Sequence, residues 1–124
     1  MPRAKAAAPN RRATSPEVPP HREPARHEVP AVDEAALAAA RTADKLLECA
    51  RERGSKRWSD FLAPLPELLR DANVLELRSV AMRARAAYGP RDSIRDALPG
   101  ELTGPFLDEL DRLRKAVNRE LAER

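Results

Sequence analysis

Apolar residues recur every three or four positions in three stretches of the chain that follow Asp33. This spacing places their side chains on one face of an α-helix, so it predicts helices over about 34–53, 74–87 and 105–121. No stretch alternates β-branched and polar residues, and we therefore predict no β-strand. The apolar positions are Ala36, Ala40, Ala43, Leu47 and Ala50 in the first helix, Leu77, Val80, Ala81, Ala84 and Tyr88 in the second, and Phe106, Leu110, Leu113, Val117 and Leu121 in the third.

Residues that suit helix ends flank these stretches. Asp33 is a good N-cap for the first predicted helix, and Gly54 is a typical C-terminal stop. Gly89 and Pro90 end the second predicted helix. Pro105 suits the first position of the last helix, because the N–H that proline lacks would have no partner there.

The segment between the first two predicted helices contains two of the four aromatic residues in the chain. Ser55 is positioned to cap a helix. Trp58 and Phe61 follow within one turn, which predicts that they anchor the core, and an exposed binding platform is the alternative. Pro64 and Pro66 interrupt this pattern, so we expect the helix to break near Ala63–Leu65 and to restart at Pro66.

These elements together predict a compact fold. Residues 91–98 add at most two helical turns before Pro99 and Gly100. Short connections favour antiparallel neighbours. We expect an all-α domain over residues 33–124, a small and mostly antiparallel bundle of three to four main helices.

Residues 1–32 differ from the rest of the chain in composition. They contain seven of the twelve prolines, and their only large aliphatic residues besides Met1 are Val18, Val29 and Val32. Such a segment buries too little apolar surface to offset the entropy of ordering its backbone, so we predict a disordered N-terminal arm. The arm has six basic and three acidic residues, and the predicted domain has 17 of each, so the formal charge of +3 lies in the arm.

The residue types that carry catalysis or bind cofactors and metals are scarce in the predicted domain. His21 and His27 both precede it, Cys49 is the only cysteine, and no glycine-rich phosphate loop occurs. We therefore expect no catalytic, cofactor-binding or metal site and no enzymatic activity.

The sequence also bears on location. No apolar run approaches the ~20 residues that span a bilayer, and the apolar stretch Ala6–Ala8 is too short for a signal peptide. We expect a cytoplasmic protein with no membrane partner. The bias toward Ala, Arg, Leu and Pro, with little lysine, is associated with GC-rich bacterial genomes.

Basic residues are the best candidates for binding a partner. Arg78, Arg83 and Arg85 lie mostly on the side of the second predicted helix opposite its apolar face, and Arg11 and Arg12 lie in the arm. They are candidate contacts for an acidic surface or for nucleic acid. Intramolecular pairing of the helix arginines is the alternative, and the arm lacks aromatics that would stack on bases.

Two separated segments resemble a family of small, functionally unassigned bacterial helical domains. The shared positions are Leu46, Leu47, Gly54, Trp58, Phe61, Leu62, Tyr88, Gly89, Ser93 and Asp96, within about residues 44–122. The chain departs from this pattern at Pro64 and Pro66, and at Pro90 and Asp92 in the later turn. The resemblance implies a helical fold and no activity.

Three classes of function follow from these observations. The leading hypothesis is a non-enzymatic protein-interaction module, whose partner is a second copy or a protein that it binds or neutralises. The alternative is a nucleic-acid-associated accessory protein that uses the basic arm. An enzyme would need a pocket that brings Asp92 and Asp96 together with arginines from another helix.

Overall fold

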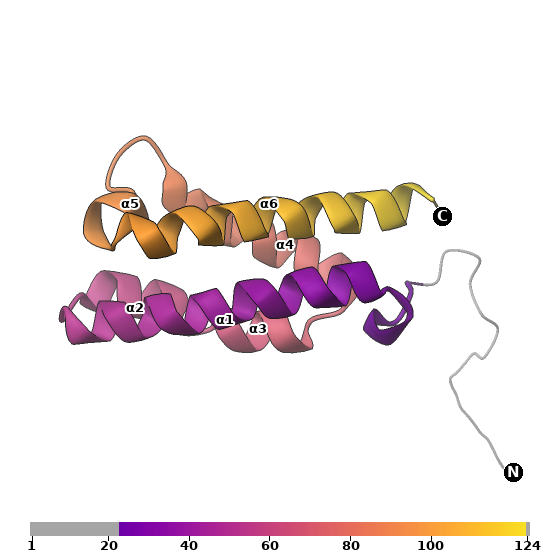
Figure 1. Ribbon diagram of the computed structural model, residues 1–124, viewed down its shortest axis with the longest axis horizontal. Coiled ribbons are helices and arrows are strands. Elements are labelled where there is room, and N and C mark those ends of the chain that lie inside the picture. Colours follow the sequence, from indigo (N-terminus) through magenta and orange to yellow (C-terminus); the bar gives the residue numbers. More distant parts are fainter. Residues whose placement is uncertain (1–22, 124) are drawn as a thin grey trace, which may run out of the picture.

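The computed structural model describes residues 23–123, and none of these residues lies in a β-strand. The predicted all-α class is therefore confirmed. Residues 1–22, which include Arg11 and Arg12, lie outside the described residues. In chain order the elements are η1 (Arg26–Glu28), α1 (Pro30–Glu52), α2 (Lys56–Leu62), α3 (Leu65–Asp71), α4 (Val74–Arg85), η2 (Ala86–Tyr88), α5 (Ile94–Ala97) and α6 (Gly100–Ala122) (Figure 1).

The elements form a four-helix bundle. α1, α4 and α6 are three of its helices, and α2 and α3 together take the place of the remaining one. α1 packs against α6 on one side and against α2 and α3 on the other, and α4 packs against α6 and α3. α1 begins at the same end of the bundle at which α6 ends (Figure 1). Helices that follow one another in the chain therefore run in opposite directions, with α2 and α3 counted as one, as the short connections predicted.

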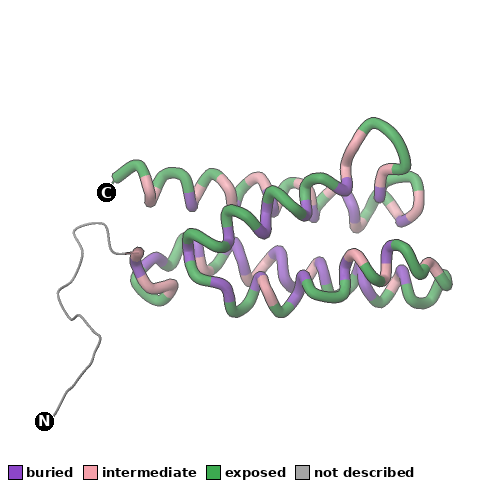
Figure 2. Tube along the Cα trace, turned by 180° about the vertical axis from the view of Figure 1, so that it is seen from behind, coloured by how far each residue is buried: buried purple, intermediate pink, exposed green. Residues whose placement is uncertain are grey.

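The core lies along the seam between the two long helices α1 and α6. α1 buries many alanines along this seam, and their small side chains let the two helices approach closely. α6 contributes larger side chains, of which Phe106, Leu110 and Leu113 are fully buried. Buried positions line the inside of the bundle and exposed positions its outside (Figure 2). Every apolar position predicted from the spacing is buried, except Tyr88 and Leu121, which are half-buried.

The corner between α1 and α2 follows the predicted residue chemistry. Gly54 adopts a left-handed φ of 70°, which favours glycine. The amide of Gly54 donates to the carbonyl of Arg51 (3.0 Å) and that of Ser55 to the carbonyl of Ala50 (2.9 Å), the pair of bonds that closes many helices. The hydroxyl of Ser55 then accepts from the amide of Trp58 and caps α2.

Pro64 and Pro66 divide the helical segment after α1 into two short helices, as predicted. α2 ends at Leu62, and α3 begins at Leu65 with Pro66 in its first turn. Proline is tolerated there because the first amides of a helix have no partner within it. Two seven-residue helices therefore stand where an unbroken helix would otherwise run.

The packed helical part of the chain reaches back before residue 33, the boundary expected from the sequence. α1 starts at Pro30, η1 precedes it, and both Val29 and Val32 are buried in the core. Asp33 is therefore not the N-cap. Its carboxylate instead accepts from Arg26, a contact that depends on how the chain folds back and that local sequence does not reveal.

The last helix also begins earlier than predicted. α6 starts at Gly100, so Pro105 lies inside the helix and not at its first position. The amides of Leu102 and Thr103 both donate to the carbonyl of Pro99 at 3.0 Å and close the first turn. Gly104 has no Cβ to clash with the ring of the following proline, which eases helical geometry before Pro105.

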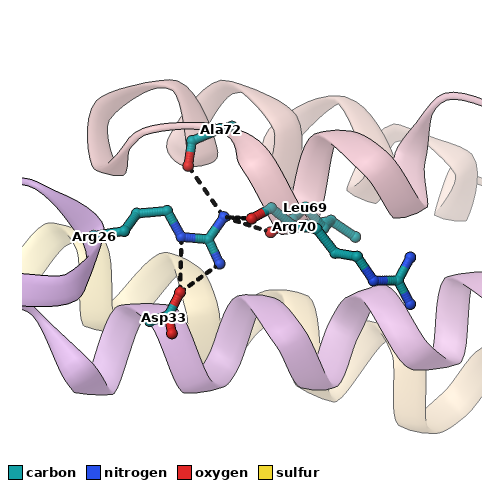
Figure 3. A network of polar contacts seen from close by, with 5 residues as sticks. All are labelled: Arg26, Asp33, Leu69, Arg70 and Ala72. Atoms are coloured by element: carbon teal, nitrogen blue, oxygen red, sulfur yellow. Dashed lines mark hydrogen bonds and ion pairs between the residues drawn. The ribbon is translucent and has the colours of Figure 1, made fainter.

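Arg26 ties the segment that leads into α1 to the end of α3 (Figure 3). One nitrogen of its guanidinium, Nη1, donates to the carbonyls of Leu69, Arg70 and Ala72 at 2.6–3.1 Å, and Nε donates to Asp33 at 2.9 Å. The side chain is only 11% exposed. Arg26 thus satisfies carbonyls at the end of α3 that have no partner within that short helix.

Glu23 makes a second bridge to the same corner. Its carboxylate accepts from the backbone amide of Leu75 at 2.5 Å, in the first turn of α4. The helix N-cap, Asn73, makes no side-chain capping bond. A residue from outside the helix therefore performs the capping, and the segment that leads into α1 fixes both ends of the α3–α4 connection.

Candidate functional site

The three candidate arginines of α4 divide into two groups. Nε of Arg85 donates to Asp111 of α6 at 2.7 Å, so Arg85 is held in an intramolecular ion pair. Arg78 and Arg83 are exposed, and neither forms an ion pair with any residue from 23 to 123. The predicted cluster is therefore not one strip: two guanidiniums remain accessible to a partner, and the third joins α4 to α6.

Two large apolar side chains lie exposed on the same helix. Leu75 is 51% exposed and Met82 is 57% exposed, and they are the large hydrophobic residues that the described part of the chain leaves most open to water. They are seven residues apart, so they lie on the same side of α4, two turns apart. We call the outward side that carries them the α4 face, comprising Leu75, Arg78, Met82, Arg83 and Ala86.

Sequence reasoning missed Leu75 and Met82. It followed the apolar residues that share the inner face of the helix and did not ask which apolar residues were left outside it. Leu75 is two positions before Leu77, and Met82 directly follows Ala81, so neither fits the inner stripe. Apolar residues off the buried face of a confidently placed helix are the signal that would have found this surface.

A hollow of about 290 Å³ lies beyond the C-terminal end of the α4 face. α2 forms one side of it with Trp58 and Phe61, and η2 forms the opposite side with Ala86 and Ala87. The rings of Trp58 and Phe61 meet edge to face, with centroids 5.6 Å apart. Trp58 is buried, as predicted for a core anchor, whereas Phe61 is only half-buried.

Charged side chains surround this hollow. The guanidinium of Arg57 lies 4.7 Å from the centre of the Trp58 ring. The same side chain is 4.0 Å from the carboxylate of Asp92, at the outer limit of an ion pair between two exposed groups. Arg91 also lines the hollow and is exposed, with no ionic partner in the described region. The rim therefore carries two positive charges and one negative charge.

The loop that carries Asp92 is held in an unusual backbone conformation. Asp92 has a φ of 50°, a left-handed value that costs a side chain other than glycine about 1 kcal/mol. The loop then enters α5, where the hydroxyl of Ser93 accepts from the amide of Arg95 at 3.1 Å. This geometry places Arg91 and Asp92 at the rim of the hollow.

Tyr88 anchors the base of the same loop. Its hydroxyl donates to the carbonyl of Thr103 in α6 at 2.5 Å. Burial of the ring raises the pKa of Tyr88 well above its usual range, and the guanidinium of Arg95, 5.4 Å from the ring centre, opposes that rise only in part. Tyr88 is therefore a neutral donor at physiological pH, with a positioning role rather than an acid–base role.

A second hollow, of about 270 Å³, lies between the first turn of α1 and the last turns of α6. Its lining includes Arg112, Lys115 and Arg119 from α6 and Glu34 from α1. All four are exposed. Three cationic side chains and one carboxylate therefore line this hollow in contact with solvent.

The hollow between α2 and η2 brings Asp92 together with Arg57 of α2, but Asp96 does not line it. No three histidine, cysteine, aspartate or glutamate side chains are grouped as metal ligands in residues 23–123. Asp92 and Asp96 are both exposed, and Arg57 approaches Asp92 across the hollow. His27, which we expected to precede the folded region, lies within it, exposed in η1.

Within the same range, each helix is too short or too polar to cross a bilayer. In comparisons with known proteins, no family model, no curated protein and no solved structure matches this chain.

Proposed function

We propose that this chain is a non-enzymatic protein-interaction module whose α4 face binds an acidic, amphipathic helix of another protein. The observation that carries the proposal is the pair of exposed apolar side chains, Leu75 and Met82, flanked by the guanidiniums of Arg78 and Arg83, which form no ion pair with residues 23–123. Exposed apolar side chains that share one face are typical of surfaces that a partner covers.

The spacing of these residues suits a helical partner. Leu75 and Met82 are seven positions apart, the repeat at which two helices that lie along each other bring apolar side chains into contact. Carboxylates beside the partner's apolar stripe would pair with Arg78 and Arg83, whose planar guanidiniums favour carboxylates. An acidic apolar helix complements this face in both shape and charge.

A second copy of the chain complements the face less well. In a symmetric pair, the same patch meets itself about a two-fold axis. Stacking Leu75 of one copy on Met82 of the other places that axis between residues 78 and 79, which brings the two Arg78 guanidiniums together. Like charges facing each other oppose association, so we propose a different protein as the partner.

The remaining features of the chain support binding rather than catalysis. Asp92 and Asp96, the acidic residues considered for an enzyme, are both exposed, and Asp92 lies beside Arg57. Cys49 is a free, half-buried thiol on α1, which accords with a reducing cytoplasm as the proposed compartment.

The test is affinity capture from the native host combined with light scattering of the purified chain. We expect a monomer that retains a partner protein, and the partner should be lost from the double variant Leu75→Glu, Met82→Glu and from Arg78→Glu, Arg83→Glu. A matched control, Ala63→Glu with Ala122→Glu, adds the same charge at exposed alanines outside α4 and should retain the partner.

Three outcomes would overturn the proposal. Capture that survives both sets of α4 variants places the binding surface elsewhere. A dimer that the Leu75 and Met82 variants dissociate identifies a second copy as the occupant. Retained nucleic acid that is released steeply by salt supports the alternative function of a nucleic-acid-associated accessory protein.

A further inference from the structure

We infer that the hollow between α2 and η2 is a pocket for a large apolar side chain with a carboxylate close to it. The inference rests on the proposed function, because it assigns the pocket to the same acidic, amphipathic partner. It adds an anchor point beyond Leu75 and Met82, together with the chemistry that this point selects.

The pocket continues the α4 face without a break. Leu75, Met82 and Ala86 are separated by seven and then four residues, so they follow one side of the helix as it passes into η2. Ala86 is exposed and forms part of the pocket wall. A partner helix that lies along α4 therefore reaches the pocket about one turn after it passes Met82.

The walls of the pocket are suited to an apolar group. Phe61, which is half-buried, supplies most of the aromatic surface on one side, since Trp58 is only 6% exposed, and the small side chain of Ala86 leaves space on the other. Cavities of about 150 Å³ hold a benzene ring, and this hollow, although open to solvent, has about 290 Å³. A phenylalanine or leucine side chain therefore fits, and covering Phe61 would remove apolar surface from water.

The rim selects for negative charge. Of its three charged groups, Asp92 faces Arg57 at 4.0 Å, whereas Arg91 makes no ion pair with residues 23–123. Arg57 is also fixed above Trp58 by its contact with the ring. A carboxylate on a residue next to the apolar side chain lies within reach of these guanidiniums, which would pair with it as charged hydrogen-bond donors.

Trp58 makes the pocket directly observable. It is the only tryptophan in the chain and it lines the pocket, so its fluorescence reports binding there. The probe is N-acetyl-L-phenylalanine, which carries a phenyl ring and a carboxylate, compared with its neutral amide. We expect a saturable change in Trp58 emission with a Kd on the order of 1–10 mM for the acid, and binding about 2- to 5-fold weaker for the amide.

Variants separate the pocket from the rest of the α4 face. Ala86→Leu fills the pocket from an exposed position and should weaken probe binding at least about 5-fold, while Arg91→Gln should remove the preference for the acid over the amide. Arg112→Gln is the matched control for Arg91→Gln, because it removes the same charge from an exposed site on α6 outside the pocket and should leave probe binding unchanged. Circular dichroism and thermal melting verify that each variant is folded.

The two proposals fail in different ways. The pocket is overturned if Trp58 emission is unchanged up to about 20 mM probe, if the amide binds as well as the acid, or if Ala86→Leu has no effect. None of these results touches the capture experiment on Leu75 and Met82. Conversely, if the Leu75 and Met82 variants lose the partner but the probe does not bind, the α4 face remains the proposed interface and the pocket is not part of it.

Discussion

The two sides of the bundle are built from helices of very different length. On one side α1 and α6, each 23 residues long, pack along each other through small and large buried side chains. On the other side stand α2 and α3, with seven residues each, and α4, with twelve. The exposed apolar residues and the aromatic pocket lie on the second side.

The long and the short helices therefore differ in what they contribute, the long pair to stability and the short helices to the surface that we propose binds a partner. Helices shorter than about 12–15 residues are marginal by themselves, so α2 and α3 depend on packing and on capping by other segments. The long pair supplies that packing. The short helices, with their prolines and tight corners, leave apolar side chains and a hollow uncovered. We infer that α1 and α6 form the scaffold and that α2, η2 and α4 present the binding surface.

The strongest test of this contrast is to remove a large side chain from each side. Leu110→Ala in α6 should lower the free energy of unfolding by about 2–5 kcal/mol, because it leaves a cavity in the fully buried seam. Leu75→Ala in α4 should change it by less than about 0.5 kcal/mol, since the side chain is half in water. Urea titration followed by circular dichroism measures both. Equal losses would contradict the division into scaffold and surface.

The dependence of the short helices on distant caps is tested at Arg26. Arg26→Ala removes the donor to three carbonyls at the end of α3 and leaves Asp33 without its partner. We expect a loss of about 1.5–3 kcal/mol, with amide exchange accelerated in α3 before α6. Arg26→Lys keeps the charge but not the planar fork, and should recover only part of the loss. Uniform acceleration across the bundle would show that Arg26 does not act on α3 in particular.

Tyr88 provides a test that depends on pH. Burial raises its pKa in the folded state above the value of about 10 that it has when unfolded, so above pH 10 the unfolded chain releases a proton that the folded chain keeps. The stability from this group is complete below pH 10 and is lost as the pH rises further. Tyr88→Phe should flatten that decline, and at pH 7 it should cost about 1 kcal/mol for the bond to Thr103.

Tyr88 is the only tyrosine, so its ionisation can be followed directly by ultraviolet absorbance. Absorbance of the folded protein should show no tyrosinate at a pH where the urea-unfolded chain is half ionised. Coincident titration of the two states would contradict burial of the hydroxyl.

The smallest expected effect concerns the rim of the pocket. Asp92→Gly relieves the left-handed conformation and should raise the free energy of unfolding by up to about 1 kcal/mol, less the weak pairing with Arg57. Gly54→Ala, at the other left-handed position, should lower it by about 1–2 kcal/mol and serves as the opposite control. A Tm that falls for Asp92→Gly would show that the carboxylate contributes more than the backbone strain costs.

Sequence patterns predicted the buried half of this molecule more fully than its surface. The three-and-four spacing identified nearly all of the inner faces of α1, α4 and α6, because burial requires a regular stripe on a regular helix. The stop at Gly54 and the break between α2 and α3 were also predicted, since glycine and proline act on their own backbone. Helix starts at Asp33 and Pro105 were wrong because η1 and the turn at Pro99 extend both helices backward.

The candidate site was predicted only in part. Arg78 and Arg83 are exposed as expected, but Arg85 is tied to Asp111, a contact between residues of two different helices that are 26 positions apart in the chain. Leu75 and Met82 were overlooked because a single helix gives no reason for an apolar residue to remain outside. The hollow beside Trp58 and Phe61 exists only because η2 and the loop at Asp92 face α2.

The sequence by itself therefore determined that residues after the N-terminal segment form helices, where most of them end, and which faces they bury. These properties depend on local propensity and on the period of a helix, both of which are written in neighbouring residues. Only the tertiary structure decided which charges pair, that Val29 and Val32 join the core, and that one apolar stripe and one aromatic hollow stay open. Those properties depend on which elements meet, because ion pairs, distant caps and pocket walls each join segments far apart in the chain.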